Sequence, residues 1–282
     1  MRFIQVLLAA ALMAAASHTF AADCEPQTQI DVSTIKPRVI LVGEMHGTEQ
    51  APAFVGDLVC SLLKAGRPVI LALERFDNEQ QALSQYIDSE GIPADRDALI
   101  GQGMWSWPMQ DGRSSVAVLA LIEKIRQLRH AGQPVGLLAM QHSVKLPLQQ
   151  LGPQAKGLAD GLSSRMNDRF MADALAGAAS AYGNYTIVAL AGNLHTSTKP
   201  SSWSAPGYQP MAQVLGELLP TFVIGLNASE GGSSWFCTGP NDCGAHKVLP
   251  GPLYAAEGQI DAVAQIGKVS ASPPAKPASP GH

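Results

Sequence analysis

Two glutamates and two histidines stand at or just beyond the ends of three apolar stretches in this chain. They are Glu44, His46, Glu74 and His195. Imidazole and carboxylate groups that meet at one point can bind a divalent metal and leave a coordination position for water, which the metal acidifies. Without a metal, a histidine can take a proton from water while a carboxylate orients its ring. Both arrangements predict hydrolysis.

The expected roles of these four residues differ between the two arrangements. In the metal-assisted form, the candidate ligands of zinc or manganese are His46, His195 and Glu44 or Glu74. In the metal-free form, His46 is the base on water, and Glu44 or Glu74 orients its ring. The structural alternatives are that Glu44 caps a following helix and that the histidines are hydrogen-bonded loop residues. No Gly-x-Ser-x-Gly pattern, the mark of a serine nucleophile, competes with these candidates.

Four further residues are candidates for substrate binding: Arg75, His142, Trp105 and Trp107. Side chains alternate along a strand, so only one of the neighbours Glu74 and Arg75 should face the site. We favour Glu74, with a structural ion pair as the alternative role of Arg75. His142 follows another apolar stretch. Trp105 and Trp107 either form an apolar wall over the site or pack against the domain.

The elements that carry these residues predict an α/β fold. Apolar stretches near 39–42, 69–73, 135–140, 185–190 and 221–226 alternate with segments whose apolar residues recur at helical spacing. Continuous apolar strands separated by helices indicate a single domain with a mainly parallel β-sheet flanked by helices. Ligands bind such sheets outside the carboxyl ends of the strands, and the candidate residues fall there.

Composition and the chain ends predict an exported protein. The chain has 282 residues, 46% of them hydrophobic, and a formal net charge of −4, which argues against disorder and against a basic face for nucleic acid. Residues 1–21 have the features of a secretory signal peptide, with a membrane anchor as the alternative. We expect a periplasmic or secreted protein that is not integral to the membrane after signal cleavage. The α/β domain is expected over 22–250, and a flexible Pro/Ala-rich tail over 251–282.

The cysteines support this location. An even number of cysteines beyond a signal peptide indicates disulfides. Cys237 and Cys243 are close enough in sequence to close a small loop, which leaves Cys24 to pair with Cys60. A zinc site made of cysteines is the alternative, but no Cys-x-x-Cys pair is present.

Several segments together resemble one known superfamily. They are Gly43–His46, Leu73–Asp77 followed by Gln80 and Tyr86, the Trp105 and Trp107 segment, Asp168–Ala172, and Gly192–His195. The chain resembles the superfamily of the ChaN-like haem-binding uptake proteins, the Tiki and TraB/GumN proteases and, more distantly, the erythromycin esterases. The resemblance covers about 39–225 and implies an α/β fold in which the two Gly-x-x-His motifs and the acid meet at the sheet edge.

The branches of this superfamily imply different chemistry. The matching positions are associated with metal-dependent proteolysis in the Tiki branch, with water activated by His and Glu in the esterase branch, and with haem in the ChaN branch. The esterase branch has one more residue between its Glu and His than Glu44-Met-His46, which argues against a macrolide ester as substrate. We predict an extracytoplasmic hydrolase, metal-assisted, that cleaves a peptide or ester bond of a peptide or small molecule. The alternative is a haem-binding protein of an iron-uptake system, with Tyr86 and Tyr208 as candidate axial ligands.

Overall fold

The computed structural model describes residues 24–107, 110–142, 153–202, 204–239, 242–254 and 258–276, without the side chains of 153–164. The predicted signal peptide and residues 277–282 of the predicted tail lie outside this part. In chain order the elements are η1 (Val32–Thr34), β1 (Val39–Glu44), α1 (Gln50–Lys64), β2 (Val69–Phe76), η2 (Asp77–Glu79), α2 (Gln80–Ile87), α3 (Pro93–Ile100), η3 (Gly103–Ser106), α4 (Val116–His130), β3 (Val135–Gln141), α5 (Pro153–Ala181), β4 (Thr186–Gly192), α6 (Met211–Leu218), β5 (Thr221–Ala228), β6 (Gly231–Gly239), β7 (Asp242–Val248), β8 (Gly251–Pro252), β9 (Ala262–Gln265) and β10 (Lys268–Val269).

The central sheet is mainly parallel, as predicted. Its strand order is β3-β2-β4-β1-β5-β8, with β9 also paired to β5. All pairs are parallel except that of β5 with β8. Every residue of β1 and β4 is buried, because helices cover both faces of a parallel sheet.

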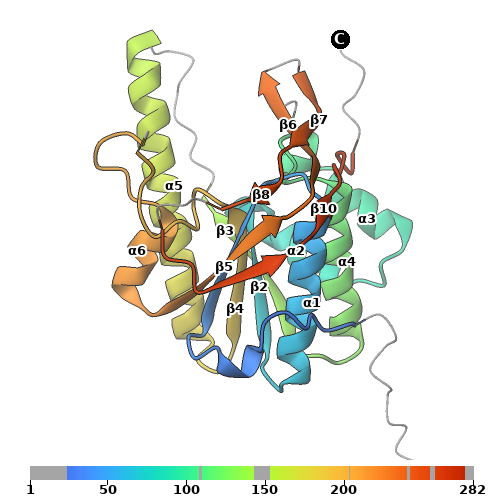
Figure 1. Cartoon of the computed structure of the whole chain (residues 1–282). Helices are drawn as coiled ribbons and strands as arrows, with labels where there is room; N and C mark the ends of the chain where they lie inside the picture. Colours follow the sequence, from blue (N-terminus) through green and yellow to red (C-terminus); the bar gives the residue numbers. More distant parts are fainter. Residues whose placement is uncertain are drawn as a thin grey trace, which may run out of the picture.

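Two hydrophobic cores lie on opposite faces of this sheet. Ile40 and Val42 belong to the core that contains residues of α1, α2 and α4, whereas Val39 and Leu41 belong to the core that contains residues of α5 and α6. Figure 1 shows these two groups of helices on either side of the sheet. The alternation of side chains along β1 therefore joins both layers, and full burial of each such side chain contributes about 1.5–3 kcal/mol. The predicted fold class is confirmed.

The C-terminal boundary predicted from composition is wrong for residues 251–276. Strand β8 pairs antiparallel with β5, β9 pairs parallel with β5, and β10 joins β6 and β7 in a second sheet. The segment beyond β10 also makes backbone hydrogen bonds to the body of the domain. A Pro/Ala-rich composition does not reveal such pairing, because backbone groups form it whatever the side chains are.

Both predicted disulfides are present, and they should differ in their effect on stability. Cys24 pairs with Cys60 across 36 residues, and Cys237 pairs with Cys243 across 6 residues, within the β6–β7 hairpin. A longer closed loop restricts the unfolded chain more, so replacing the first pair by alanines should cost about 4 kcal/mol and replacing the second about 2 kcal/mol. Urea unfolding of the two double variants checks this. Equal losses in the free energy of unfolding would contradict the expected dependence on loop length.

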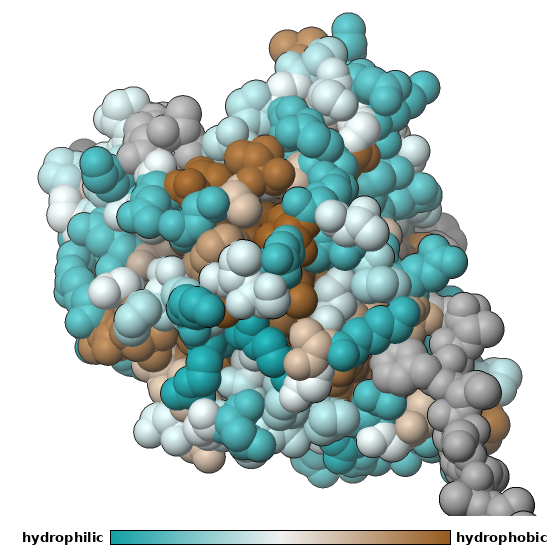
Figure 2. All heavy atoms as spheres, turned by 60° about the horizontal axis from the view of Figure 1, so that its bottom comes forward, coloured by the Kyte–Doolittle hydropathy of each residue, from teal (hydrophilic) through white to brown (hydrophobic). Residues whose placement is uncertain are grey.

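The disulfides are consistent with an extracytoplasmic protein. No helix in the described part of the chain combines the length and the apolar character needed to cross a membrane. The face in Figure 2 is largely hydrophilic, with hydrophobic residues in separate patches. Disulfides persist in oxidising compartments, which agrees with a location outside the cytoplasm.

Candidate active site

Three adjacent strands carry the predicted catalytic residues to one edge of the sheet. The strands β2, β4 and β1 are neighbours in that order, and their carboxyl ends lie together. Glu44 ends β1 opposite Gly192, which ends β4, and the Asn193 N–H donates to the Glu44 backbone oxygen at 2.8 Å. The turn after β4 carries His195, so residues distant in sequence meet here.

The two Gly-x-x-His motifs pack against each other, which explains why each begins with glycine. A Cβ on Gly43 would lie 2.3 Å from Oγ1 of Thr196, in the turn of the second motif. A Cβ on Gly192 would lie 3.0 Å from Nε2 of His46, in the first motif. Each glycine thus makes room for the other motif, and a side chain at either position would separate the histidines from their partners.

Each histidine is held by a buried carboxylate at one ring nitrogen. Nδ1 of His46 lies 2.8 Å from Oε1 of Glu44, and Nδ1 of His195 lies 2.7 Å from Oδ1 of Asp168. A carboxylate accepts hydrogen bonds, so Nδ1 of each ring is the donor. Asp168 is fully buried and also accepts from the Met211 N–H at 2.7 Å. These contacts fix both rings with Nε2 directed into the site.

Glu74 lies between the two Nε2 atoms. Its Oε2 is 3.5 Å from Nε2 of His46, and its Oε1 is 3.7 Å from Nε2 of His195. Nη1 of Arg113 donates to Oε1 at 3.0 Å, and the Gly192 N–H donates to Oε2 at 2.9 Å. Arg113 is in turn held by Asp111 and by Oε1 of Gln141. Both oxygens of Glu74 are therefore fixed, while the contacts to the histidines are longer than a good hydrogen bond.

The electrostatics of the site keep Glu74 ionised and His46 protonated. Burial raises the pKa of Glu74, but the attraction of His195, His46 and Arg113 outweighs it and holds that pKa well below its ordinary value. Burial lowers the pKa of His46, but the attraction of Glu74 and the hydrogen bond to Glu44 outweigh it and raise that pKa to about 10. At neutral pH the His46 ring therefore carries protons on both nitrogens.

The pKa of His195 is also raised. Burial lowers its pKa, Glu74 and Asp168 raise it, and the positive charge of His46 lowers it, with a net increase above the ordinary value of 6.5. A pKa of about 10 does not fit the base role that we predicted for His46, and it suits this ring to donate a proton.

Strand-end patterns in the sequence do not reveal Arg113 or the role of Asp168. Asp168 lies within α5 on the face that buries Met171, Ala172 and Leu175. A carboxylate on such an apolar face needs a partner, and this is the signal that could have found it. Arg113 lies in the loop before α4. Nothing in its local sequence separates it from other surface arginines.

Arg75 and Trp105 lie outside the group of catalytic candidates around Glu74, here called the cluster. Arg75 is 1% exposed and is paired with Glu79, and its guanidinium lies 4.2 Å from the ring centre of Trp105. It also donates to the backbone oxygen of Arg113 at 3.0 Å. The alternation along β2 thus directs Glu74 into the site and Arg75 into a buried structural cluster, so the predicted substrate-binding role of Arg75 and Trp105 does not fit their positions.

His142 and Trp107 are more exposed. Nδ1 of His142 pairs with Asp77, and its ring centre lies 4.5 Å from that of Phe170. Trp107 is 40% exposed, and its ring centre lies 4.9 Å from that of Phe76. Neither forms a hydrogen bond with the four predicted catalytic residues within the described part of the chain, so their role in substrate binding stays a prediction.

The described residues do not fit the predicted metal site. No group of three or more His, Cys, Asp or Glu side chains among them is arranged to hold a metal ion. Oε1 of Glu44 is directed at Nδ1 of His46, the ring nitrogen opposite the one that faces Glu74. The oxygens of Glu74 already bind the Arg113 guanidinium and the Gly192 N–H.

The two tyrosines considered as haem ligands are engaged elsewhere. The Tyr86 hydroxyl donates to Oε2 of Glu123 at 2.8 Å, and burial together with this bond raises its pKa to about 12. The Tyr208 hydroxyl donates to Oδ2 of Asp168 at 2.9 Å, and burial and the charge of Asp168 raise its pKa as well. An axial phenolate ligand requires loss of this proton, which both environments oppose.

Comparisons with known proteins support the fold. No protein-family model matches the chain, and no curated protein matches it. A histidine-to-asparagine mutant of the erythromycin esterase EreC, in its open conformation, is 14% identical with a TM-score of 0.55, and the match covers 76% of each chain. A succinoglycan biosynthesis protein is 14% identical with a TM-score of 0.55, and the match covers 76% of this chain and 71% of that one.

ChaN of Campylobacter jejuni, solved with cofacially bound haem, is 20% identical with a TM-score of 0.43, and the match covers 76% of this chain and 88% of that one. The two matches with TM-scores of 0.55 establish a shared fold. This chain therefore shares its fold with an erythromycin esterase, as the predicted resemblance implied.

Proposed function

We propose that this protein is an extracytoplasmic hydrolase that cleaves ester or peptide bonds, with His195 as the base on water and His46 as the proton donor. One observation carries the proposal. Two imidazoles, each held at Nδ1 by a buried carboxylate, direct their Nε2 atoms at the single carboxylate of Glu74. Paired acid and base groups around one point are what hydrolysis requires.

His195 is suited to take a proton from water. When its Nε2 is unprotonated, it can accept the proton of a water molecule while the oxygen attacks the carbonyl carbon of the substrate. The imidazolium that forms is stabilised by Asp168, which holds Nδ1 at 2.7 Å. A buried carboxylate in this position fixes both the tautomer and the direction of the ring.

His46 is suited to complete the reaction. Its Nε2–H can donate a proton to the leaving oxygen or nitrogen as the bond to the carbonyl carbon breaks, and the ring then regains the proton that His195 took from water. Glu44 holds the opposite nitrogen at 2.8 Å. Glu74 remains ionised and keeps His46 charged until a substrate atom replaces it as the acceptor.

The pH dependence of hydrolysis tests these roles. We expect kcat/KM for a neutral chromogenic ester or peptide to rise with pH as His195 loses its proton, above the ordinary pKa of 6.5. It should fall again near pH 10, where His46 loses the proton that it donates. The optimum should thus lie on the alkaline side of neutrality. A rate that is highest below about pH 6 would contradict the assignment, because His195 would then be fully protonated.

A matched pair of variants shows whether the measured rate belongs to this site. His195→Gln should retain only background activity, whereas His130→Gln removes an exposed histidine at the end of α4 and should retain the rate. Equal rates for the two variants and the unmodified protein on every ester and peptide tested would disprove the proposed function.

A further inference from the structure

The residues 270–275, here called the strap, cross the N-terminal ends of α1 and α4 (Figure 1). α1 begins four residues after His46, and α4 begins three residues after Arg113. The strap therefore contacts the segment that follows His46 and the segment that follows Arg113. These two residues bring charged groups to Glu74.

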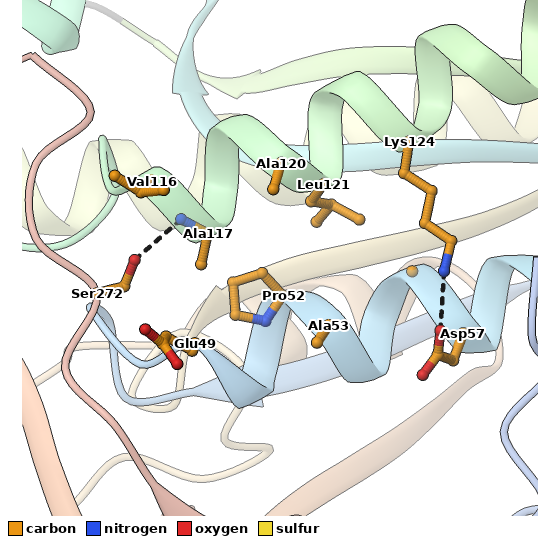
Figure 3. Close-up of a pocket in the computed structure, with 11 residues that line it drawn as sticks. Glu49, Pro52, Ala53, Asp57, Val116, Ala117, Ala120, Leu121, Lys124 and Ser272 are labelled. Carbon is orange, nitrogen blue, oxygen red and sulfur yellow. Dashed lines mark hydrogen bonds and ion pairs between the residues drawn. The ribbon is translucent and has the colours of Figure 1, made fainter. Parts of the chain in front are cut away.

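Ser272 joins these two segments by itself. Its N–H donates to the backbone oxygen of Gly47 at 2.8 Å, and its Oγ accepts from the Ala117 N–H at 2.9 Å. Figure 3 shows this hydroxyl directed at the first turn of α4, at one end of the groove between α1 and α4. The residue is 1% exposed, so water does not compete for these bonds.

Other strap residues repeat the connection on both sides of Ser272. The Glu49 N–H donates to the Ser270 oxygen at 2.9 Å on the α1 side. On the α4 side, the Val116 N–H donates to the Pro273 oxygen at 2.8 Å, and the Ala275 N–H donates to the Ser114 oxygen at 2.9 Å. Backbone N–H groups at helix N-termini lack partners within the helix, and the strap supplies them.

The two segments also touch directly, next to the catalytic residues. A Cβ on Gly112 would lie 2.3 Å from the amide nitrogen of Gly47, so the residue after His46 packs against the residue before Arg113. Close packing of this kind transmits a displacement of one segment to the other. A change at the strap should therefore alter the placement of both His46 and Arg113.

We infer that Ser272 is a positioning residue for the site. Through its two hydrogen bonds it fixes the separation between the His46 turn and the Arg113 loop, and thereby the distance of both groups from Glu74. The inference rests on the proposed function where it concerns catalysis, and on geometry alone where it concerns the environment of the His46 ring. The charged or titratable groups that face this ring are Glu44 from β1, Glu74 from β2, His195 after β4, and Arg113 and Asp111 before α4.

Ser272→Ala tests the inference, with Ser270→Ala as the matched control. The Ser270 hydroxyl has no hydrogen-bond partner among the described residues, so its loss leaves the strap contacts intact. We expect Ser272→Ala to lower kcat about tenfold with KM unchanged, since a small misplacement affects the reaction more than substrate binding. NMR titration of the His46 ring should give a lower pKa in this variant than in Ser270→Ala, because the ring lies farther from Glu74.

A second pair of variants covers the case in which Ser272→Ala does not fold. Ser272→Thr keeps the hydroxyl, and Ser272→Val replaces it by a methyl group of similar size. Only the threonine variant should therefore retain the kcat and the His46 pKa of the unmodified protein. Identical kcat and identical His46 titration in Ser272→Ala and Ser270→Ala would overturn the inference. If the unmodified protein hydrolyses no substrate, the proposed function fails, and the NMR comparison alone still decides whether Ser272 positions the ring.

Discussion

Replacing Glu74 by Gln is expected to lower the pKa of His46 from about 10 toward its ordinary value of 6.5 and to reduce hydrolysis at least about a hundredfold. The attraction of Glu74 is the largest influence that raises this pKa, and burial, which lowers it, remains in the variant. With a lower pKa, the His46 ring is no longer fully protonated at the alkaline optimum, so the proton donor is lost. NMR titration of the ring and kcat/KM measured on the same preparation check both effects.

Glu79→Gln is the control for this prediction. Glu79 is also a buried glutamate paired with an arginine, but its partner is Arg75, outside the cluster. Its replacement should reduce the free energy of unfolding and leave the pKa of His46 unchanged. If the two variants shift the His46 pKa equally, general loosening of the domain explains the effect better than the charge of Glu74 does.

Replacing Asp168 by Asn should reduce kcat by roughly a thousandfold while leaving the fold intact. The amide removes the charge that stabilises the His195 imidazolium. The pKa of His195 should fall, because Asp168 is one of the groups that raise it. With its oxygen in the place of Oδ1, the amide can still accept from the Met211 N–H, and its NH₂ group can donate to the Tyr208 hydroxyl oxygen, so we expect a small change in stability.

Asp173→Asn provides the matched change on the same helix. Asp173 is exposed and forms an i, i+4 pair with Arg169, an interaction worth little in water. This variant should keep the activity and the His195 titration of the unmodified protein. A full rate in Asp168→Asn would show that the buried carboxylate holds the chain together without contributing to the reaction.

The sequence by itself predicted the fold class and the four catalytic candidates at the strand ends. Continuous apolar runs bounded by Gly and Pro identify buried strands locally, and the alternation of side chains assigned Glu74 to the site and Arg75 to an ion pair. The strand ends identified Glu44, His46, Glu74 and His195, which the structure brings together. The cysteine spacing predicted both disulfides.

The composition of the C-terminal region wrongly predicted a flexible tail over residues 251–276. The strap is held by backbone hydrogen bonds to Gly47, Glu49, Ser114 and Val116, and these leave no pattern in side-chain type. For the same reason, the position of Ser272 between two helices could not be inferred from a segment rich in Pro and Ala.

Only the tertiary structure decided which groups share the site and what each can do. Strand order places β4 between β2 and β1, and this order depends on packing between residues far apart in the chain. The same packing brings Asp168 from α5 and Arg113 from a loop to within hydrogen-bond distance of His195 and Glu74. Since a pKa depends on the distances between charges and on burial, the proposed roles of His46 as donor and His195 as base are argued from these contacts and not from residue types.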